Sequence, residues 1–280
     1  MSKFKTIVFG GSGFLGSHIA DALSNSGHEV TIYDLVESPF LRDDQKMIIG
    51  SLQDKEFLQK AISGKDFLYH FAGVADIDFA RNNPEKTYLD NVIGTLNLLE
   101  LTKRYCYDAK FIFMSTNKVY GDNPNKLKFY EKNSRWELKK NDNFFKGIDE
   151  KFPIDDCTHS FFGVSKSYGD LLVQEYGKNI GLKTVTFRAG CITGSNHSGA
   201  KLHGFLSFLV KSCLKNKKYS IIGYKGKQVR DNIHSSDLIN CFWEFYKKPT
   251  SGEIYNIGGG RYSNCSILEA IEIIEKELNI

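Results

Sequence analysis

Paired cysteines are missing from this sequence. Its 280 residues include six cysteines, scattered with no C-x-x-C pair and no histidine at metal-ligand spacing. This pattern predicts neither a zinc site nor a disulfide framework. We therefore expect no bound metal, and a reducing cytoplasm is the expected compartment.

Long apolar runs and a strong charge of one sign are also missing. No apolar stretch approaches membrane-spanning length, and the start of the chain, "MSKFKTIVFGG", enters an apolar strand without a signal-peptide pattern. A net charge of +4, from 37 basic and 33 acidic residues, is too mild to indicate nucleic-acid binding. We expect neither a membrane nor a nucleic acid as a partner, whereas a small anionic substrate is compatible with this charge.

Hydrophobic residues, in contrast, are plentiful. They make up 41% of the chain, enough for one large core or two unequal lobes. Short apolar runs at 5–10, 29–34, 66–73 and 109–116 alternate with longer helical patterns, such as 16–26. This alternation is typical of βαβ units. We predict an α/β fold with a Rossmann-type doubly wound parallel sheet, covered by helices on both faces.

A glycine pattern opens the first predicted helix. Gly10, Gly13 and Gly16 follow the first strand, where glycines permit a tight turn and let the backbone approach a pyrophosphate at the helix N-terminus. Asp34 ends the next strand, where a carboxylate binds the two hydroxyls of an adenosine ribose and repels a 2′-phosphate. The pattern predicts NAD as the cofactor, in preference to NADP. The alternative is that the glycines only cap a helix and Asp34 closes a turn.

Several motifs then follow in an order that is more specific than any of them alone. They are "GGSGFLG" (10–16), "YHFAG" (69–73), "DNVIGTLNLLE" (90–100), "MSTNKVYGD" (114–122), "FFGVSK" (161–166), "GKQVRDNIHSSDL" (226–238) and "YNIGGG" (255–260). In this order the chain resembles the extended short-chain dehydrogenase/reductases, and within them the NAD-dependent nucleotide-sugar epimerases and dehydratases. The resemblance covers nearly all of the sequence. It implies an enzyme of carbohydrate metabolism, an isomerase whose substrate is a nucleotide-diphosphate sugar.

The resemblance also implies roles for individual residues. Cofactor contacts are implied for Gly10, Gly13, Phe14, Leu15, Asp34, Leu52, Phe71, Ala72, Gly73, Asn91 and Lys166. Substrate contacts are implied for Thr116, Asn117, Lys118, His197 and Arg230. The Arg230 guanidinium suits the diphosphate of the substrate, and a salt bridge with Asp231 is its alternative role. For His197 and His203, a hydrogen bond to the backbone or a surface position is the alternative to catalysis.

One catalytic position departs from the family pattern. Thr116, Phe162 and Lys166 fall where the family has its catalytic Ser/Thr, Tyr and Lys, so Phe162 occupies the place of the proton-transferring tyrosine. A phenyl ring cannot ionise. Losing a general base costs about 10²–10⁴-fold in rate, which slows a reaction without abolishing it. Another group or a water chain would then move the proton. Alternatively, the chain is a non-catalytic relative that binds NAD and a nucleotide sugar. A nucleotide-sugar reductase is a third reading.

The residues after Thr116 narrow the reaction. Dehydratases of this family carry an Asp-Glu pair there, whereas this chain has Asn117 and Lys118, so dehydration is disfavoured. The strings "STNKVYGD", "SRWE" (134–137) and "GKQVRDNIHSSDL" resemble epimerases that invert C2 of a CDP-linked dideoxyhexose. The resemblance implies transient oxidation to a keto-sugar, followed by re-reduction.

The resemblance further implies two lobes. We expect residues 1–190 to form the NAD-binding Rossmann domain, with a return segment at about 229–243. Residues 193–228 and 244–280 would form the substrate lobe. Relatives continue past this lobe for several dozen residues, so its C-terminus is expected to be short.

Two further segments carry expectations. The polar stretch 122–158 is expected to be a lid or rim loop with short ordered pieces. Family members pair through two long helices, which correspond here to about 84–104 and 163–180. The apolar residues of these helices must be divided between the core and a partner, so we expect a homodimer.

Overall fold

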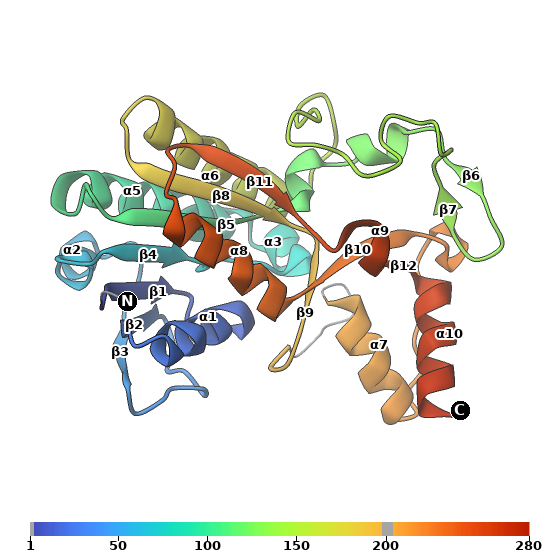
Figure 1. The fold of residues 1–280 in the computed structure, drawn as a ribbon, viewed down its shortest axis with the longest axis horizontal. Coiled ribbons are helices and arrows are strands. Elements are labelled where there is room, and N and C mark those ends of the chain that lie inside the picture. The colour runs from blue at the N-terminus through green and yellow to red at the C-terminus, as the bar shows by residue number, and fades with distance from the viewer. Residues whose placement is uncertain (1–2, 198–203, 280) are drawn as a thin grey trace.

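A seven-stranded parallel sheet forms the larger part of the molecule (Figure 1). The structure is a computed structural model that describes residues 3–197 and 204–279. From edge to edge the strands run β11, β8, β5, β4, β1, β2 and β3, and every neighbouring pair is parallel. This order places the carboxyl ends of β1, β4 and β5 side by side. The predicted Rossmann-type α/β fold is confirmed.

Four of the seven strands coincide with the predicted apolar runs, and a fifth overlaps the motif "YNIGGG" (255–260), which resembles the last strand of the family. The other two strands were not predicted. The strands are β1 (Lys5–Phe9), β2 (Glu29–Asp34), β3 (Gln45–Ile49), β4 (Phe67–His70), β5 (Lys110–Thr116), β8 (Lys183–Ala189) and β11 (Glu253–Ile257). The edge strand β3 has only one buried residue, Gln45, so it lacks the apolar run that marks the central strands.

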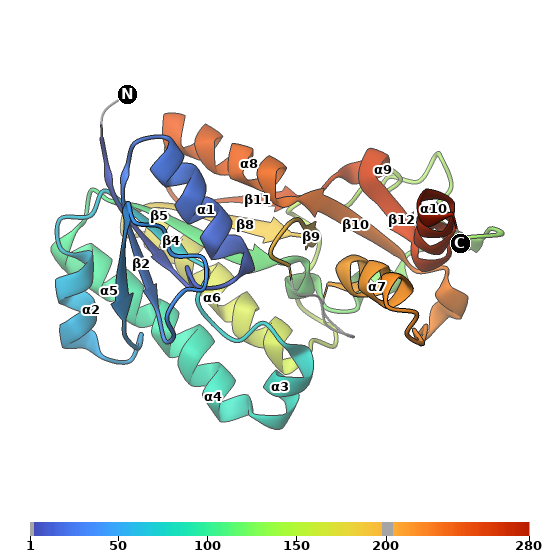
Figure 2. The same ribbon diagram turned by 90° about the horizontal axis from the view of Figure 1, so that it is seen from below.

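Helices cover both faces of this sheet. They are α1 (Phe14–Asn25), α2 (Lys55–Ile62), α3 (Ile77–Asn82), α4 (Pro84–Tyr88), α5 (Gly94–Tyr105), α6 (Phe161–Lys178) and α8 (Ser235–Lys247), and a π-helical turn, η1 (Leu89–Ile93), joins α4 to α5. Helices α1 and α8 pack on one face, and α2, α5 and α6 pack on the other. Figure 2 shows the two helical layers on either side of the strands.

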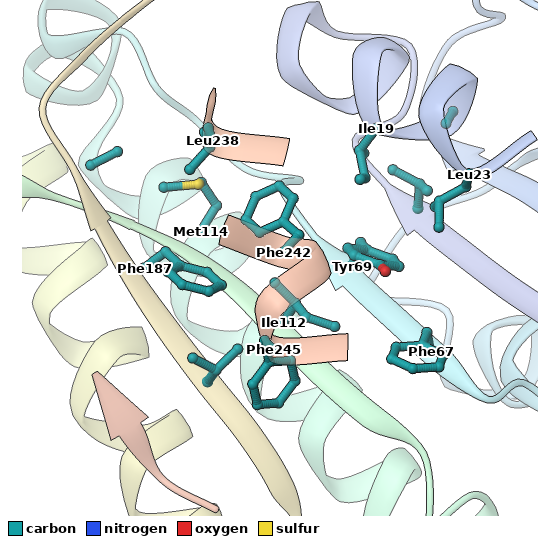
Figure 3. Close-up of a cluster of buried hydrophobic side chains, with 14 of the residues drawn as sticks. Ile19, Leu23, Phe67, Tyr69, Ile112, Met114, Phe187, Leu238, Phe242 and Phe245 are labelled. Atoms are coloured by element: carbon teal, nitrogen blue, oxygen red, sulfur yellow. The ribbon is translucent and has the colours of Figure 1, made fainter. Parts of the chain in front are cut away.

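Strand residues alternate between the two cores, as a pleated strand requires. On β1, Val8 enters the core under α1 and α8, whereas Ile7 and Phe9 enter the core under α2 and α5. Figure 3 shows the first of these cores, in which Phe242 of α8 lies among side chains of the sheet and Ile19 of α1 lies close by. The alternation explains why the central strands read as continuous apolar runs in the sequence.

A smaller lobe lies beside the carboxyl ends of the large sheet (Figure 1). It contains β9 (Cys191–Thr193), α7 (Phe205–Leu214), a 3₁₀ turn η4 (Tyr224–Gly226), β10 (Val229–His234), α9 (Gly260–Ser263), β12 (Asn264–Ser266) and α10 (Ile267–Leu278). Its sheet has the order β12, β10, β9. Helices α7 and α10 share the core of this lobe.

The sheets divide the chain differently from the expected lobe boundaries at two places. Strand β11 lies within the range 244–280, yet it pairs with β8 at the edge of the large sheet, where each provides the other with hydrogen-bond partners. The return segment 229–243 is split, because β10 pairs with β9 and β12 while α8 packs on the large sheet. The chain thus crosses from one lobe to the other between His234 and Ser235.

The polar stretch 122–158 contains short ordered pieces. They are the 3₁₀ turn η3 (Asn123–Lys126) and a hairpin of β6 (Tyr130–Glu131) and β7 (Trp136–Glu137). The indole of Trp136 donates to the Tyr224 carbonyl at 3.3 Å, and Glu137 accepts two hydrogen bonds from Arg261, both at 2.9 Å. Both contacts attach the hairpin to the smaller lobe.

Residues 3–197 and 204–279 contain neither a helix suited to crossing a membrane nor a side-chain cluster suited to a metal ion. Among these residues, no helix combines the length and hydrophobicity needed to span a bilayer. Over the same ranges, no group of three or more His, Cys, Asp or Glu side chains is arranged to hold a metal ion.

Candidate active site

The glycine loop between β1 and α1 is shaped by close backbone contacts. Gly10 has φ +79°, and a Cβ there would lie 2.6 Å from the Ala72 nitrogen on the neighbouring strand end. A Cβ on Gly16 would lie 2.2 Å from the Gly10 carbonyl oxygen. A side chain at Gly10 would clash with the end of β4, and a side chain at Gly16 would push α1 away from the loop after β1. Glycine is therefore required at both positions for the tight packing.

The first turn of α1 is open to an anion. Its N-cap residue, Gly13, provides no side-chain hydrogen bond, and the turn that begins with Phe14 and Leu15 contains no acidic residue. The N–H groups of that turn therefore have no side-chain acceptor, and the helix dipole adds positive potential. This cradle fits a dinucleotide pyrophosphate.

Asp34 lies at the carboxyl end of β2, beside the glycine loop. One carboxylate oxygen accepts a hydrogen bond from the Ser12 N–H at 3.0 Å, and the other accepts from the Leu35 N–H at 2.7 Å. These bonds orient the carboxylate and leave it acceptor capacity, because an ionised carboxylate has about four acceptor positions. The Asp34 carboxylate is therefore held next to the cradle, where the ribose of an adenine dinucleotide would lie.

The end of β4 and the π-helical turn η1 form the next wall. The Val74 N–H donates to Asn91 Oδ1 at 2.7 Å, and Asn91 Nδ2 donates back to the Val74 carbonyl at 2.9 Å. Gly73 has φ +138°, and a Cβ on it would lie 2.4 Å from Asn91 Oδ1. Leu52 packs against Gly94 at the other end of the turn, and the Leu52 carbonyl accepts a hydrogen bond from the Asn97 side chain at 2.9 Å. Asn91 thus fixes the strand segment that contains Phe71, Ala72 and Gly73.

Thr116 ends β5 and caps a 3₁₀ turn, η2 (Asn117–Tyr120). Its hydroxyl accepts from the Lys118 N–H at 3.3 Å and donates to Asn117 Oδ1 at 3.4 Å. The start of α6 packs on this turn, since a Cβ on Gly163 would lie 3.0 Å from the Lys118 carbonyl oxygen. The structure therefore brings Thr116 and the first turn of α6 to the same end of the sheet.

Phe162 and Lys166 are one helical turn apart on α6. Phe162 is buried, with 7% of its surface exposed. The Lys166 Nζ lies 4.3 Å from the centroid of the Phe113 ring, and within residues 3–197 and 204–279 it makes no hydrogen bond or ion pair. Burial lowers the pKa of Lys166 to about 8, although the Asp170 charge opposes the shift. Lys166 is therefore a partly buried cation without an ionic partner in the described chain.

Charged groups also gather where the two lobes meet. Burial, and then the charge of Arg230, lower the pKa of Lys118. Burial raises the pKa of the Cys191 thiol, and the charges of Arg230 and Lys118 oppose this rise. Strands β9 and β10 bring Cys191 opposite Asn232. The predicted residues Lys118 and Arg230 thus share one positively charged region, and sequence reasoning missed Cys191 because nothing in its local pattern marked it.

The alternative role for Arg230 is not observed. Asp231 Oδ1 accepts instead from the N–H groups of Gly259 and Gly260, both at 2.9 Å. The Arg230 guanidinium donates to the Val229 carbonyl at 3.2 Å and forms no ion pair within the described ranges. Its charge is therefore available to an anionic ligand.

His197 lies at the glycine loop. Its ring stacks on Phe14 with a centroid distance of 4.5 Å, and its Nδ1 is 3.0 Å from the Ser207 hydroxyl. The neighbouring helix position His18 contacts the Ser195 carbonyl at 2.6 Å. These contacts hold the segment before residue 198 against α1, so His197 lies next to the cofactor cradle. His203 lies outside the described residues.

Sequence reasoning also missed the polar groups behind the site. Ser165 accepts from Asn91 Nδ2 at 2.8 Å, and His70 lies 2.8 Å from the Thr95 hydroxyl. These contacts join residues 74 and 25 positions apart, so local spacing gave no signal of them. A histidine at the end of a buried strand was the one available clue.

Comparisons with known proteins find similar sequences and similar folds. Residues 6–258 match the sequence pattern of the NAD dependent epimerase/dehydratase family. The CDP-paratose 2-epimerase of Salmonella typhi is similar over nearly the whole chain, with 30% identity in an alignment that covers 99% of this chain and 85% of the relative.

Two solved structures are similar in fold and sequence. The UDP-glucuronic acid 4-epimerase of Bacillus cereus, in complex with UDP-glucuronic acid and NAD, matches with a TM-score of 0.75 and 27% identity, covering 99% of this chain and 83% of that chain. A tyrosine-to-phenylalanine mutant of that enzyme, in complex with UDP-4-deoxy-4-fluoro-glucuronic acid and NAD, matches with a TM-score of 0.75 and 26% identity, at the same coverage of 99% and 83%.

Proposed function

Since the chain belongs to the NAD-dependent epimerase/dehydratase family, we propose that it is a nucleotide-sugar epimerase, with C2 of a CDP-linked dideoxyhexose as its first candidate reaction centre. The chain is an enzyme of this family, and NAD is its cofactor. The observation that carries the proposal of C2 epimerisation is the 30% identity to CDP-paratose 2-epimerase over 99% of the chain.

The chain's own residues would hold NAD in one orientation. The first turn of α1 would bind the pyrophosphate, and the Asp34 carboxylate would accept from the adenosine ribose hydroxyls. Lys166 would reach the nicotinamide ribose from α6. Its lack of an ionic partner within the described residues supports this role, because a ligand would then provide the missing acceptor.

The substrate would lie between the two lobes. Arg230 would bind the diphosphate through its guanidinium, with Lys118 adding positive charge. Thr116 would orient the sugar hydroxyl at the end of β5. We also propose that the Rossmann domain binds NAD and that the substrate lobe binds the nucleotide sugar. His197 and Asn117 would lie at the rim of the site.

Epimerisation requires a hydride and a proton to leave the same carbinol group and then return. When bound, NAD supplies the hydride acceptor and donor. The proton of the sugar hydroxyl must pass to a base, and Phe162 provides none. We propose that proton transfer uses another group or a water chain beside Thr116 and Lys166, at reduced rate.

A binding-only relative is the second candidate, and Phe162 is the observation that favours it. A mutant of a similar epimerase that carries a tyrosine-to-phenylalanine change still holds both NAD and a nucleotide sugar. Occupation of both sites is therefore compatible with a lost phenol in this fold.

One experiment separates these candidates. The protein, with NAD added, would be incubated with CDP-, UDP-, GDP- and dTDP-sugars, and the products would be identified by NMR. Inversion at one carbon without net consumption of NAD is the expected result. Binding of NAD without turnover on the full panel would favour the binding-only relative, and net oxidation or reduction of the sugar would indicate a dehydrogenase or reductase.

We further propose that the chain forms a homodimer through α6 and the helical stretch at about 84–104. Helix α6 exposes a line of apolar residues at helical spacing, namely Phe161, Val164, Tyr168 and Leu171. Tyr88 and Leu89, on the adjoining α4 and η1, are also exposed. An apolar stripe of this size on a helix is typical of a partner interface. Sedimentation giving only monomer at micromolar concentration would contradict the proposal.

The compartment is also a proposal. All six cysteines are free thiols, each half-buried. Free thiols are the usual state of cysteine in a reducing compartment, so we expect the enzyme to work in the cytoplasm.

A further inference from the structure

His70 is a buried polar residue that the proposed mechanism does not use. It ends β4, directly before the strand segment that lines the cofactor cradle, and it is 0% exposed. Its ring is surrounded by phenylalanines, with ring centroids 5.4 Å from Phe113, 6.1 Å from Phe111 and 6.4 Å from Phe9. An imidazole in such a core is costly unless its nitrogens have partners.

Only one ring nitrogen has a partner among the described residues. His70 Nε2 lies 2.8 Å from Thr95 Oγ1, and Nδ1 is buried without a hydrogen bond within those residues. The Thr95 hydroxyl donates its hydrogen to the Asn91 carbonyl at 2.7 Å. Thr95 must therefore accept from His70, which places the imidazole proton on Nε2 and leaves Nδ1 bare.

The hydrogen-bond chain continues to the start of α6. Asn91 Nδ2 donates to Ser165 Oγ at 2.8 Å, and Ser165 Oγ donates to the Phe162 carbonyl at 2.8 Å. Each member has a consistent donor and acceptor role. The chain thus runs from the end of β4, through the π-helical turn η1, to the backbone of residue 162.

The same chain fixes the cofactor wall. Asn91 makes two hydrogen bonds with the Val74 backbone, at 2.7 and 2.9 Å, next to Gly73. A π-helical turn is an uncommon backbone form that often marks a functional position. The bond between Thr95 and the Asn91 carbonyl stabilises this turn, and His70 in turn fixes the Thr95 hydroxyl.

We propose that His70 and Thr95 are positioning residues, which set the placement of α6 relative to the NAD-binding wall through Asn91 and Ser165. This inference rests on the proposed function for its kinetic part only. The unpartnered Nδ1 of His70 supports this proposal. A phenylalanine at residue 70 would avoid the cost of burying that nitrogen, but it could not donate a hydrogen bond to Thr95, so the hydrogen-bond chain would lose its first member. A second contact links His70 to α6, because the Phe113 ring packs against His70 and also lies 4.3 Å from Lys166 Nζ.

The test uses a matched pair of buried threonines on α5. Thr95→Val removes the hydroxyl that links His70 to Asn91. Thr102→Val is the control, because Thr102 is equally buried and donates to the Leu98 carbonyl at 2.7 Å without reaching the site. Thr95→Ser keeps the hydroxyl and should restore function. His70→Phe and His70→Gln form a second pair, in which glutamine retains a donor.

Two readouts are needed. NAD affinity, measured by calorimetric titration, tests the placement of the cofactor wall whether or not the right sugar is known. Turnover on any active nucleotide sugar tests the placement of α6, and a misplacement of about 1 Å costs on the order of 10²-fold.

We expect Thr95→Val and His70→Phe to weaken NAD affinity several-fold, and to lower kcat more than they raise KM, with Thr95→Ser and Thr102→Val near wild type. Equal effects of Thr95→Val and Thr102→Val on NAD affinity would overturn the inference, even if no sugar is turned over. If His70→Phe fails to fold, the threonine series alone decides.

Discussion

Helix α6 carries two charged side chains one turn apart, and they are held in opposite ways. Asp170 is 0% exposed and accepts hydrogen bonds from Arg188 at 2.8 and 3.0 Å, from Ser115 at 2.6 Å and from Gln174 at 2.9 Å. Lys166 has the Phe113 ring at 4.3 Å and no ionic partner in the described ranges.

The difference separates a charge that stabilises the fold from one that is available to a ligand. Arg188 also donates to Tyr120 at 3.0 Å, and Tyr120 donates to Asn256 at 2.7 Å, so the Asp170 network joins α6, β8, β11 and the turn after β5. Such a network is complete without any bound molecule. Lys166 has a perturbed pKa, and its ammonium has no hydrogen-bond acceptor among the described residues, which together are typical of a functional position.

The strongest test of this comparison is to break the paired charge. Asp170→Asn would leave Arg188 buried without a counter-charge, and breaking a buried pair costs about 3–5 kcal/mol. Urea unfolding would measure the loss in the free energy of unfolding. Lys166→Met is the matched control one turn away, and we expect it to be neutral or stabilising. A loss of less than about 1 kcal/mol for Asp170→Asn would contradict the assignment.

The second test restores the missing phenol one turn before Lys166. Phe162→Tyr should raise turnover on the right nucleotide sugar by about one to several powers of ten, because a positioned acid/base is worth about 10²–10⁴-fold. Phe161→Tyr is the matched control, since Phe161 is 55% exposed and a phenol there would face solvent. NMR rate measurements on both variants give the comparison.

The outcome of that test also identifies the proton path. Unchanged turnover in Phe162→Tyr, with NAD still bound and Lys166 still required, would show that the proton moves through a different group. His197 is a weak candidate for that group, because its ring is stacked on Phe14 at the glycine loop.

The sequence predicted those parts of the site that depend on local spacing. Gly10, Gly13 and Asp34 follow consecutive elements of one βαβ unit, and Phe162 and Lys166 share a helix face because they are four residues apart. The predicted strands and the sheet followed from the same local patterns.

The parts that were not predicted depend on distant pairings. Asp170 and Arg188 meet only because α6 packs on β8, and His70 meets Thr95 only because β4 lies beside α5. Neither residue type nor spacing marks such contacts. The pairing of strand β11 with β8 was not predicted for a related reason, since the two strands lie far apart in the sequence.

The third test concerns Asp34, a carboxylate with fewer hydrogen-bond partners than Asp170 and more than Lys166. Asp34 has two backbone donors yet remains half-exposed beside the cradle. We expect the protein to bind NAD more tightly than NADP, and Asp34→Ala to narrow this preference by about tenfold, because one repulsive charge near a 2′-phosphate is removed. Calorimetric titration with both cofactors measures the ratio. Asp54→Ala, which removes a helix cap on α2, is the control. Equal or tighter binding of NADP by the wild type would refute the assignment.

The smallest expected effect is the pH dependence of the contribution that Lys166 makes to the free energy of unfolding. Burial lowers the pKa of Lys166 from 10.5 to about 8, so between these values the unfolded chain binds more protons than the folded chain. The contribution of Lys166 to stability therefore becomes more favourable as pH rises from about 8 to 10.5, and the burial penalty is fully present below about 8. Urea unfolding of wild type and Lys166→Met at pH 7, 8 and 9.5 should show the advantage of the methionine variant shrinking with rising pH. Turnover should move the opposite way and fall above about pH 8, since the ammonium form is the one that can donate to the nicotinamide ribose. A constant difference in stability across this range would mean that Lys166 already has a counter-charge in the folded protein, and the contrast with Asp170 would then be lost.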